Sequence, residues 1–288
     1  MGRGCQIGTR KNLIKGINFI MGDFSQNGII SNLHDFGTKT TADIEKELVK
    51  FSKERKMELI LPSLYSELKG DALPNIVKQI GETKYLNHII VGLDKASKVE
   101  AVNAWKFFKK LNTPFTILWN DGPRLKKLHE ELKEKDLAPS EMGKGRNVWY
   151  CLGMCIARDE ARSVALHDCD IKTYDRRMLA KLFYPVVNPF FNFEFCKGYY
   201  PRIANGKMNG RVARLLVFPL LTALEKTIGR SDYLEFMKSF KYPLAGEFSF
   251  RRNVLPELRI SSDWGIEVGI LSEMQRNFSP QNICQVDL

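Results

Sequence analysis

Two aspartates, Asp168 and Asp170, stand one residue apart directly after a short apolar run at residues 164–167. A buried strand of an α/β protein delivers its last side chains to the carboxyl edge of the sheet, where ligands bind. Carboxylates at that edge suit a divalent ion that also binds a diphosphate, because hard cations prefer carboxylate and phosphate oxygens. An Asp-x-Asp pair on an unrelated loop is usually a solvated turn. Because this pair follows a predicted strand directly, it indicates the donor site of a nucleotide-sugar transferase.

A second candidate site lies in the loop Gly143-Lys144-Gly145-Arg146, which precedes a long apolar helical pattern. The glycines allow the backbone to approach a phosphate closely, Lys144 supplies a positive charge, and a helix N-terminus follows. The loop lacks the spacing of a P-loop. A plain glycine-rich turn is the alternative interpretation.

Polar residues follow the first predicted strand in the segment Leu61-Pro62-Ser63-Leu64-Tyr65-Ser66-Glu67. A polar turn at the carboxyl edge of the sheet is where the base and ribose of a nucleotide lie. A loop with a helix cap explains the same residues equally well.

A basic stretch runs from residue 195 to residue 224 without one acidic side chain; its charges are Lys197, Arg202, Lys207, Arg211 and Arg214. Gly210 and Arg211 begin a predicted helix, so a guanidinium lies beside free backbone N–H groups, which favours a phosphate or carboxylate. A solvated basic loop is the alternative. A nucleic-acid groove requires aromatic residues interleaved with the charge, and this stretch is too short for one.

The formal net charge of +11 is concentrated in part at the amino terminus. Four of the 44 basic residues and none of the 33 acidic ones lie in residues 1–22, so residues 23–288 carry 40 against 33. We expect residues 1–22 to form a basic, disordered tail, since they lack the apolar core of a secretory signal. No apolar run reaches the roughly 18 residues of a membrane span. The six cysteines show no paired spacing, which favours reduced, buried thiols in a cytoplasmic protein.

Four apolar runs, at residues 59–61, 88–93, 115–119 and 164–167, alternate with helical patterns. This alternation predicts an α/β fold with a doubly wound parallel sheet. Later segments predict a strand at 192–200, a helix at 211–228 that Pro219 kinks or splits, and a helix at 265–276. We expect one domain over residues 23–288, with a Rossmann-like nucleotide-sugar half (57–175) merged with an acceptor half (176–288).

In order along the chain, these segments resemble the glucosyl-3-phosphoglycerate synthases, which are retaining glycosyltransferases with the GT-A fold. The resemblance extends from about Asp23 to Leu288. It is carried by the segments Leu61-Pro62-Ser63-Leu64, Gly143-Lys144-Gly145, His167-Asp168-Cys169-Asp170, Gly210-Arg211-Val212, Pro243-Leu244-Ala245-Gly246-Glu247 and Gly265-Ile266-Glu267-Val268-Gly269.

The resemblance implies a role for each candidate residue. The donor nucleotide is lined by Pro62, Ser63, Leu64 and Glu67. Lys144 contacts the donor, Asp168 binds ribose or metal, and Asp170 ligates Mg²⁺, Mn²⁺ or Co²⁺. Gly210 and Arg211 receive the phosphoglycerate. Glu267 orients the transferred glucose, and the Leu244 carbonyl lies near the reacting centre.

The implied reaction moves glucose from UDP-glucose or GDP-glucose to the hydroxyl of 3-phosphoglycerate with retention, in a metal-dependent homodimer that binds neither nucleic acid nor membrane. The alternatives are a related transferase with another sugar donor or acidic acceptor, and a nucleotide-sugar-binding protein with an incomplete metal site. Ala213 replaces a threonine that contacts the acceptor in the family. The family's third metal ligand, a histidine, follows the segment matching residues 285–288, so we expect a truncated carboxyl terminus, a substitute histidine or weakened metal binding.

Overall fold

The computed structural model describes residues 28–37, 39–201, 203–204, 207–208, 210–261 and 265–288. The predicted basic tail, residues 1–22, lies outside the described residues. Over the part of the chain that the structure describes, no helix has the length and apolar character needed to cross a membrane.

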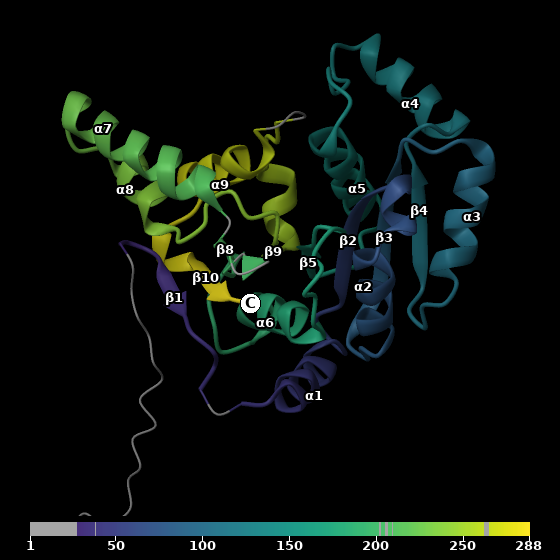
Figure 1. Ribbon diagram of the computed structural model, residues 1–288, viewed down its shortest axis with the longest axis horizontal. Helices are drawn as coiled ribbons and strands as arrows, with labels where there is room; N and C mark the ends of the chain where they lie inside the picture. Colours follow the sequence, from purple (N-terminus) through teal and green to yellow (C-terminus); the bar gives the residue numbers. More distant parts are fainter. Residues whose placement is uncertain (1–27, 38, 202, 205–206, 209, 262–264) are drawn as a thin grey trace, which may run out of the picture.

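A mixed eight-stranded sheet forms the centre of the molecule, in the order β1-β10-β6-β9-β5-β2-β3-β4 (Figure 1). Neighbouring strands run parallel except β9, which is antiparallel to both β5 and β6. Two short strands, β7 and β8, form a separate antiparallel pair. The strands are β1 (Ser31–Leu33), β2 (Met57–Leu64), β3 (Leu86–Asp94), β4 (Phe115–Trp119), β5 (Ser163–Leu166), β6 (Phe195–Tyr199), β7 (Ile203–Ala204), β8 (Lys207–Met208), β9 (Phe248–Arg251) and β10 (Ile283–Asp287).

Nine α-helices occur in the described residues, and the strand–helix alternation predicted for the first half is confirmed. The α-helices are α1 (Thr41–Phe51), α2 (Ala72–Gly81), α3 (Lys98–Phe108), α4 (Pro123–Lys133), α5 (Lys144–Arg158), α6 (Arg176–Val187), α7 (Phe218–Ile228), α8 (Asp232–Ser239) and α9 (Ile266–Asn277). Short 3-10 helices lie at Tyr65–Lys69, Arg252–Glu257 and Pro280–Asn282, and a π-helical turn at Ala213–Val217 precedes α7. The predicted helix at 211–228 is helical throughout, but it changes from a π-helical turn to α-helix just before Pro219, which stands in the first turn of α7.

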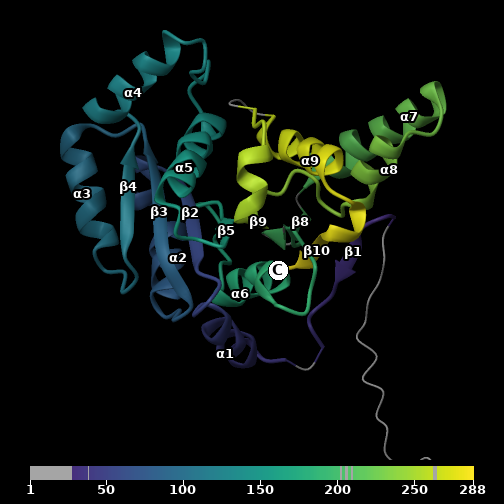
Figure 2. The same cartoon turned by 180° about the vertical axis from the view of Figure 1, so that it is seen from behind.

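Helices cover both faces of the sheet (Figures 1 and 2). Side chains alternate across a strand, so Leu59 and Leu61 pack in one core with α1, α2 and α6, whereas Ile60 packs in the other with α5, α8 and α9. This double burial explains why the central strands read as continuous apolar runs.

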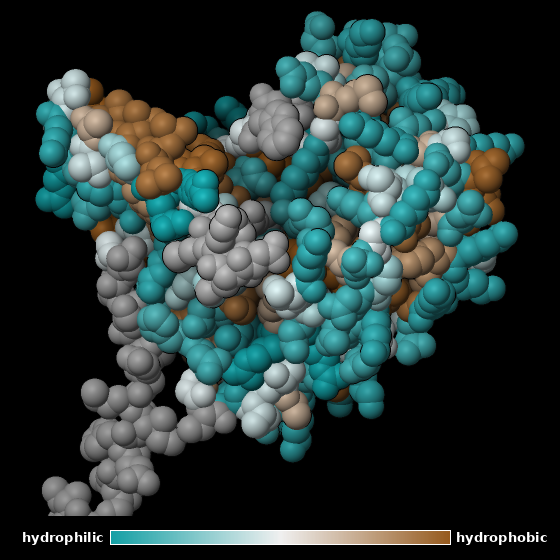
Figure 3. Space-filling model, in the orientation of Figure 1, coloured by the Kyte–Doolittle hydropathy of each residue, from teal (hydrophilic) through white to brown (hydrophobic). Residues whose placement is uncertain are grey.

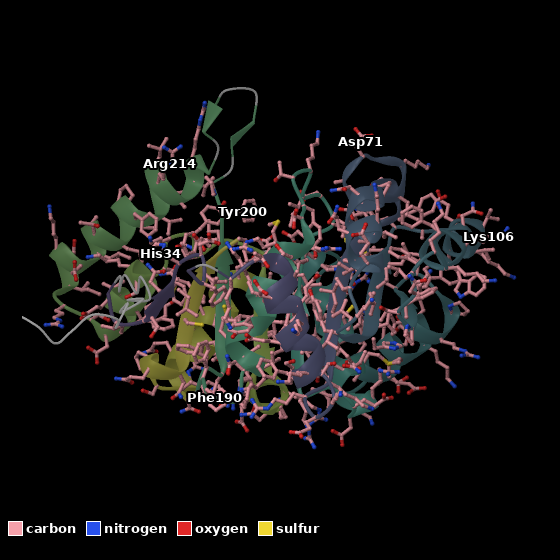
Figure 4. The ribbon with its side chains drawn as sticks, turned by 90° about the horizontal axis from the view of Figure 1, so that it is seen from below. His34, Asp71, Lys106, Phe190, Tyr200 and Arg214 are labelled. Carbon is pink, nitrogen blue, oxygen red and sulfur yellow. The ribbon has the colours of Figure 1, made fainter. Side chains whose placement is uncertain are left out.

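The carboxyl ends of the parallel strands meet at one edge of the sheet. In Figure 4, Tyr200, just after β6, and Asp71, beyond β2, lie towards the upper edge, and Phe190, before β6, lies at the opposite edge. Because β9 runs the other way, its amino end reaches the same edge as the carboxyl ends of β5 and β6. Residues 243–247, which precede β9, are thereby brought to the ends of β2, β5 and β6.

The strand β2 is longer than predicted and includes Pro62 and Ser63, which we expected in a turn. β5 pairs with β2 only as far as Ile60, so the missing N–H of Pro62 lies beyond that ladder. The polar turn begins after Leu64, as a 3-10 helix.

Candidate functional site

Lys144, Asp168 and Glu267 meet at the carboxyl edge of the sheet, although they come from three distant segments. The Lys144 Nζ lies 2.6 Å from the Asp168 Oδ1 and 2.9 Å from the Glu267 Oε1. Lys144 is the first residue of α5, Asp168 follows β5, and Glu267 lies in the first turn of α9. The side chains are 35%, 21% and 16% exposed, so the cluster is reached from solvent but screened from it on most sides.

The charges of this cluster balance one another. Burial opposes the positive charge on Lys144, but the Asp168 and Glu267 carboxylates outweigh it and raise the pKa of the ammonium above its usual range. Lys144 therefore remains protonated at every physiological pH. It has three N–H donors, so two acceptors within the cluster leave it capable of a further bond to an anionic ligand.

Gly246 lies directly against this cluster. A Cβ added to Gly246 would stand 2.3 Å from the Asp168 Oδ2 and 2.6 Å from the Lys144 Nζ. Only a residue without a side chain allows the backbone of residues 243–247 to approach the charged groups this closely.

Glu67 and Asp170 extend the site towards the end of β2. The Leu64 N–H donates to the Glu67 Oε2 at 3.1 Å. Burial is the main cause that raises the pKa of Glu67, and the charges of Asp170 and Asp168 raise it further against a hydrogen bond from Ser63. Asp170 is exposed, whereas Pro62 and Ser63 are buried beneath the turn. Ser63, Glu67 and Asp168 of the predicted donor-binding residues therefore lie close together at the ends of β2 and β5, with Asp170 near them.

The aspartate pair suits a divalent ion only in combination with other ligands. In the described ranges, no three His, Cys, Asp or Glu side chains gather as a metal site. Mg²⁺ is commonly held by one or two carboxylates, with substrate phosphates and water completing the octahedron. Asp168 and Asp170 supply oxygen donors of that kind. Their negative charges also repel that of Glu67 and raise its pKa, and a bound cation would reduce this repulsion.

The two predicted acceptor residues lie beside the turn that precedes Gly246. Gly210 adopts a φ of +78°, and a Cβ there would lie 3.6 Å from the Tyr242 ring. Arg211 is exposed, and Ala213, two residues on, is buried. Gly210 thus borders the turn from which Gly246 reaches Asp168, and the exposed Arg211 is the next residue along the chain.

Leu244 is the third residue of a tight turn that closes with a hydrogen bond from the Ala245 N–H to the Tyr242 carbonyl at 3.2 Å. Its side chain is half-buried, and Ala245 is fully buried. The turn places the Leu244 peptide two residues from Gly246, in the segment that contacts Lys144.

Two charged residues near the site have positions that the sequence did not predict, Lys197 and Arg146. Lys197 was assigned to the basic stretch, but its side chain is buried in β6 and donates to the Ala245 carbonyl. A lysine inside the apolar strand pattern of residues 195–199 was the available signal. The Nη2 of Arg146, two residues after Lys144, lies 2.9 Å from the Asp94 Oδ1 at the end of β3, a pair that the sequence alone does not reveal.

The remaining candidates have structural roles. His167 is fully buried and packs on Tyr174 with ring centroids 5.3 Å apart, so its side chain belongs to the core. The five described cysteines are free and buried, as expected.

A cavity of about 440 Å³ lined by Arg55, Ser163 and Arg251 lies at the amino ends of β2 and β5, on the edge of the sheet opposite the cluster of Lys144, Asp168 and Glu267.

Comparison with known proteins gives two close relatives. The chain is 44% identical over 268 residues to a glucosyl-3-phosphoglycerate synthase of Persephonella marina, covering 93% of this chain and 66% of the relative. It is 38% identical to the synthase of Methanococcoides burtonii, covering 92% of this chain and 65% of the relative. The chain therefore spans just under two thirds of the length of these relatives. No protein-family model matches it.

Among solved structures, a glucosyl-3-phosphoglycerate synthase of Mycobacterium tuberculosis in complex with phosphoglyceric acid has a TM-score of 0.63 at 20% identity, covering 90% of this chain and 78% of that chain. The same enzyme in complex with Mn²⁺ and UDP-glucose has a TM-score of 0.62 at 20% identity, covering 89% and 76%. The mixed sheet with helices on both faces is thus the fold of the GT-A glycosyltransferases. At the level of sequence, the identity to the two close relatives shows that the chain belongs to the glucosyl-3-phosphoglycerate synthase family.

Proposed function

We propose that this protein transfers glucose from UDP-glucose or GDP-glucose to the hydroxyl of 3-phosphoglycerate, in a metal-dependent reaction with retention of the α configuration. The observation that carries the proposal is the contact of Lys144 with both Asp168 and Glu267, beside the close approach of Gly246. The named activity of the two close relatives supports the reaction and its substrates.

In this proposal, the donor lies across the ends of β2, β5 and α5. Ser63, Leu64 and Glu67 would contact the nucleoside with Pro62 beneath them, and Asp168 and Asp170 would hold a Mg²⁺ or Mn²⁺ ion. When bound there, such an ion would supply Lewis-acid stabilisation of the departing diphosphate. Lys144 donates to a phosphate oxygen from the N-terminus of α5, where the helix dipole also favours negative charge.

The acceptor is anionic, and Gly210 and Arg211 offer it a backbone N–H and a guanidinium at the start of a helical segment. Arginine binds a carboxylate or phosphate with two parallel hydrogen bonds, which fixes orientation as well as position. Such a clamp directs the acceptor hydroxyl towards the anomeric carbon, which accelerates transfer by removing the entropy cost of alignment.

Retention requires the acceptor to attack from the face that the diphosphate leaves. We assign the Leu244 carbonyl to the opposite side of the sugar, where a fixed dipole stabilises positive charge that develops at the anomeric carbon. Glu267 accepts hydrogen bonds from glucose hydroxyls. Its link to Lys144 couples the position of the sugar to that of the diphosphate.

The test combines the protein with NDP-glucose, Mg²⁺ or Mn²⁺ and 3-phosphoglycerate, and measures nucleoside diphosphate release. Release that requires all three components supports the proposal, and parallel reactions with UDP-glucose and GDP-glucose identify the donor. Release that is independent of acceptor, or that occurs only with another sugar or another acid from a panel, contradicts it.

We also propose that the protein forms a homodimer through α7. Leu220, Leu224 and Ile228 recur every four residues on this helix and are 51%, 38% and 67% exposed. Leu215 and Leu216 continue the apolar surface into the π-helical turn, and Figure 3 shows it as a brown patch over α7. A second copy related by a two-fold axis would cover the ridge with the same side chains.

A further inference from the structure

One charged group at the site has no role in the proposed chemistry. Lys197, on β6, is 1% exposed, and its Nζ donates to the Ala245 carbonyl and lies 5.5 Å from the centre of the Phe248 ring. Burying an ammonium group is costly unless it is paired. At this buried strand position a lysine therefore stabilises the fold less than a methionine of similar length would.

Lys197 lies close to the charged residues of the candidate site. Burial lowers the pKa of Lys197 to about 8, and the nearby carboxylates only partly restore it. The charged groups that act on it come from α9, α5, the residue after β5 and the segment before β9; they are Glu267, Lys144, Asp168 and Glu247.

Lys197 bonds the carbonyl of Ala245, the residue after Leu244. The described backbone contains no cis peptide bond, and in a trans peptide the N–H and C=O of one plane point in opposite directions. The Ala245 N–H, bonded to the Tyr242 carbonyl, therefore fixes the direction of the Leu244 carbonyl. The Ala245 carbonyl, bonded to Lys197, fixes the next peptide plane. Both planes that flank Ala245 are thus held.

We propose that Lys197 is a positioning residue, which holds residues 244–246 so that the Leu244 carbonyl is aimed at the sugar and Gly246 stays against Asp168 and Lys144. The inference rests on the proposed function for its catalytic consequence. Its structural content, that the amine orders the turn, does not depend on the reaction.

The test replaces Lys197 by methionine, which has a similar length and no charge, and compares it with Lys181→Met. Lys181, on α6, is the control because its amine is also buried and also donates to a backbone carbonyl, that of Asp287 at 3.0 Å. Unlike Lys197, it also lies 3.1 Å from the Asp35 Oδ1. Three quantities are measured in each variant: kcat and KM, nucleotide affinity by calorimetry with Mn²⁺, and amide hydrogen exchange of residues 242–248.

We expect the two variants to lose similar thermal stability. Only Lys197→Met should lose kcat, by ~100-fold, as expected when a group near the reacting centre is misplaced by about 1 Å. Its nucleotide affinity should be unchanged, and exchange at the Ala245 amide should rise. A kcat within threefold of wild type, or equal losses in both variants, overturns the inference. If the wild type itself does not turn over, the proposed function fails, and the exchange comparison alone decides whether Lys197 holds the turn.

Discussion

The substitution Gly246→Ala is the sharpest perturbation of the proposed donor site. The added methyl group would lie 2.3 Å from the Asp168 Oδ2, whereas ordinary contacts begin near 3.4 Å, so the carboxylate must retreat by about 1 Å. The same methyl group would lie 2.6 Å from the Lys144 Nζ. The pair that joins these residues at 2.6 Å therefore cannot keep its geometry.

A displacement of this size at reacting groups costs ~100-fold in rate, which corresponds to about 2.7 kcal/mol of transition-state stabilisation. Gly246 has no positive φ, so alanine strains the contacts and not the backbone. Since Lys144 and Asp168 are partly exposed, loss of their ion pair should change the free energy of unfolding by about 1 kcal/mol or less. We expect kcat to fall ~100-fold while the melting temperature changes little.

The assay is steady-state kinetics with both NDP-glucose donors, together with nucleotide affinity and thermal denaturation. Gly153→Ala is the control, because Gly153 lies in α5 with no atom within 4 Å of an added Cβ. It should leave kinetics unchanged and stabilise the helix by ~0.5–1 kcal/mol. If Gly246→Ala retains kcat and nucleotide affinity within about twofold of wild type, the contact of this segment with Asp168 has no part in the reaction.

Three further outcomes are expected. Asp170→Asn should abolish the metal-dependent rate and leave the melting temperature unchanged, because Asp170 is exposed; metal-dependent turnover in this variant would remove Asp170 from the metal site. Burial lowers the pKa of His167 from its usual value of 6.5 to about 3. The stability that the neutral imidazole allows is therefore fully present above pH 6.5, and the free energy of unfolding falls as the pH falls towards 3, by an amount on the order of 5 kcal/mol. Urea unfolding of His167→Phe should show a weaker acid dependence than wild type, and an unchanged dependence would contradict a buried neutral imidazole. The double variant Leu220→Glu and Leu224→Glu should sediment as a monomer where the wild type sediments as a dimer; a wild-type monomer would refute the α7 interface.

The central strands could be predicted because both of their faces are buried. Their apolar residues then form continuous runs, as at residues 88–93, and such runs need no knowledge of the tertiary structure. The strands β1 and β10 were missed, since β1 has three residues and β10 includes the polar Gln285, which donates to the Ser239 carbonyl inside the fold. The helix α6 was missed because Pro185 interrupts its pattern, although it lies near the carboxyl end of the helix, where burial outweighs the lost hydrogen bond.

The candidate site was predictable where a residue type marks a strand end or a helix start. Asp168 after β5 and Lys144 at the start of α5 are examples, and the structure brings them into contact. The antiparallel direction of β9 could not be inferred from residues 248–251, yet it decides that Gly246 reaches Asp168. Lys197 was assigned to a basic loop because other basic residues follow it in the sequence, and such a stretch suggests a solvated surface. Only the fold shows that its side chain is buried.

The most direct measurement of the central claim is the structure of the product by nuclear magnetic resonance. The protein is incubated with NDP-glucose, Mg²⁺ and 3-phosphoglycerate, and the anomeric proton and its coupled carbon are assigned. The proposed function requires an α-linked glucosyl group on the hydroxyl oxygen of 3-phosphoglycerate, formed only when metal and acceptor are both present. A β-linked product, or free glucose released at the same rate without acceptor, would contradict it.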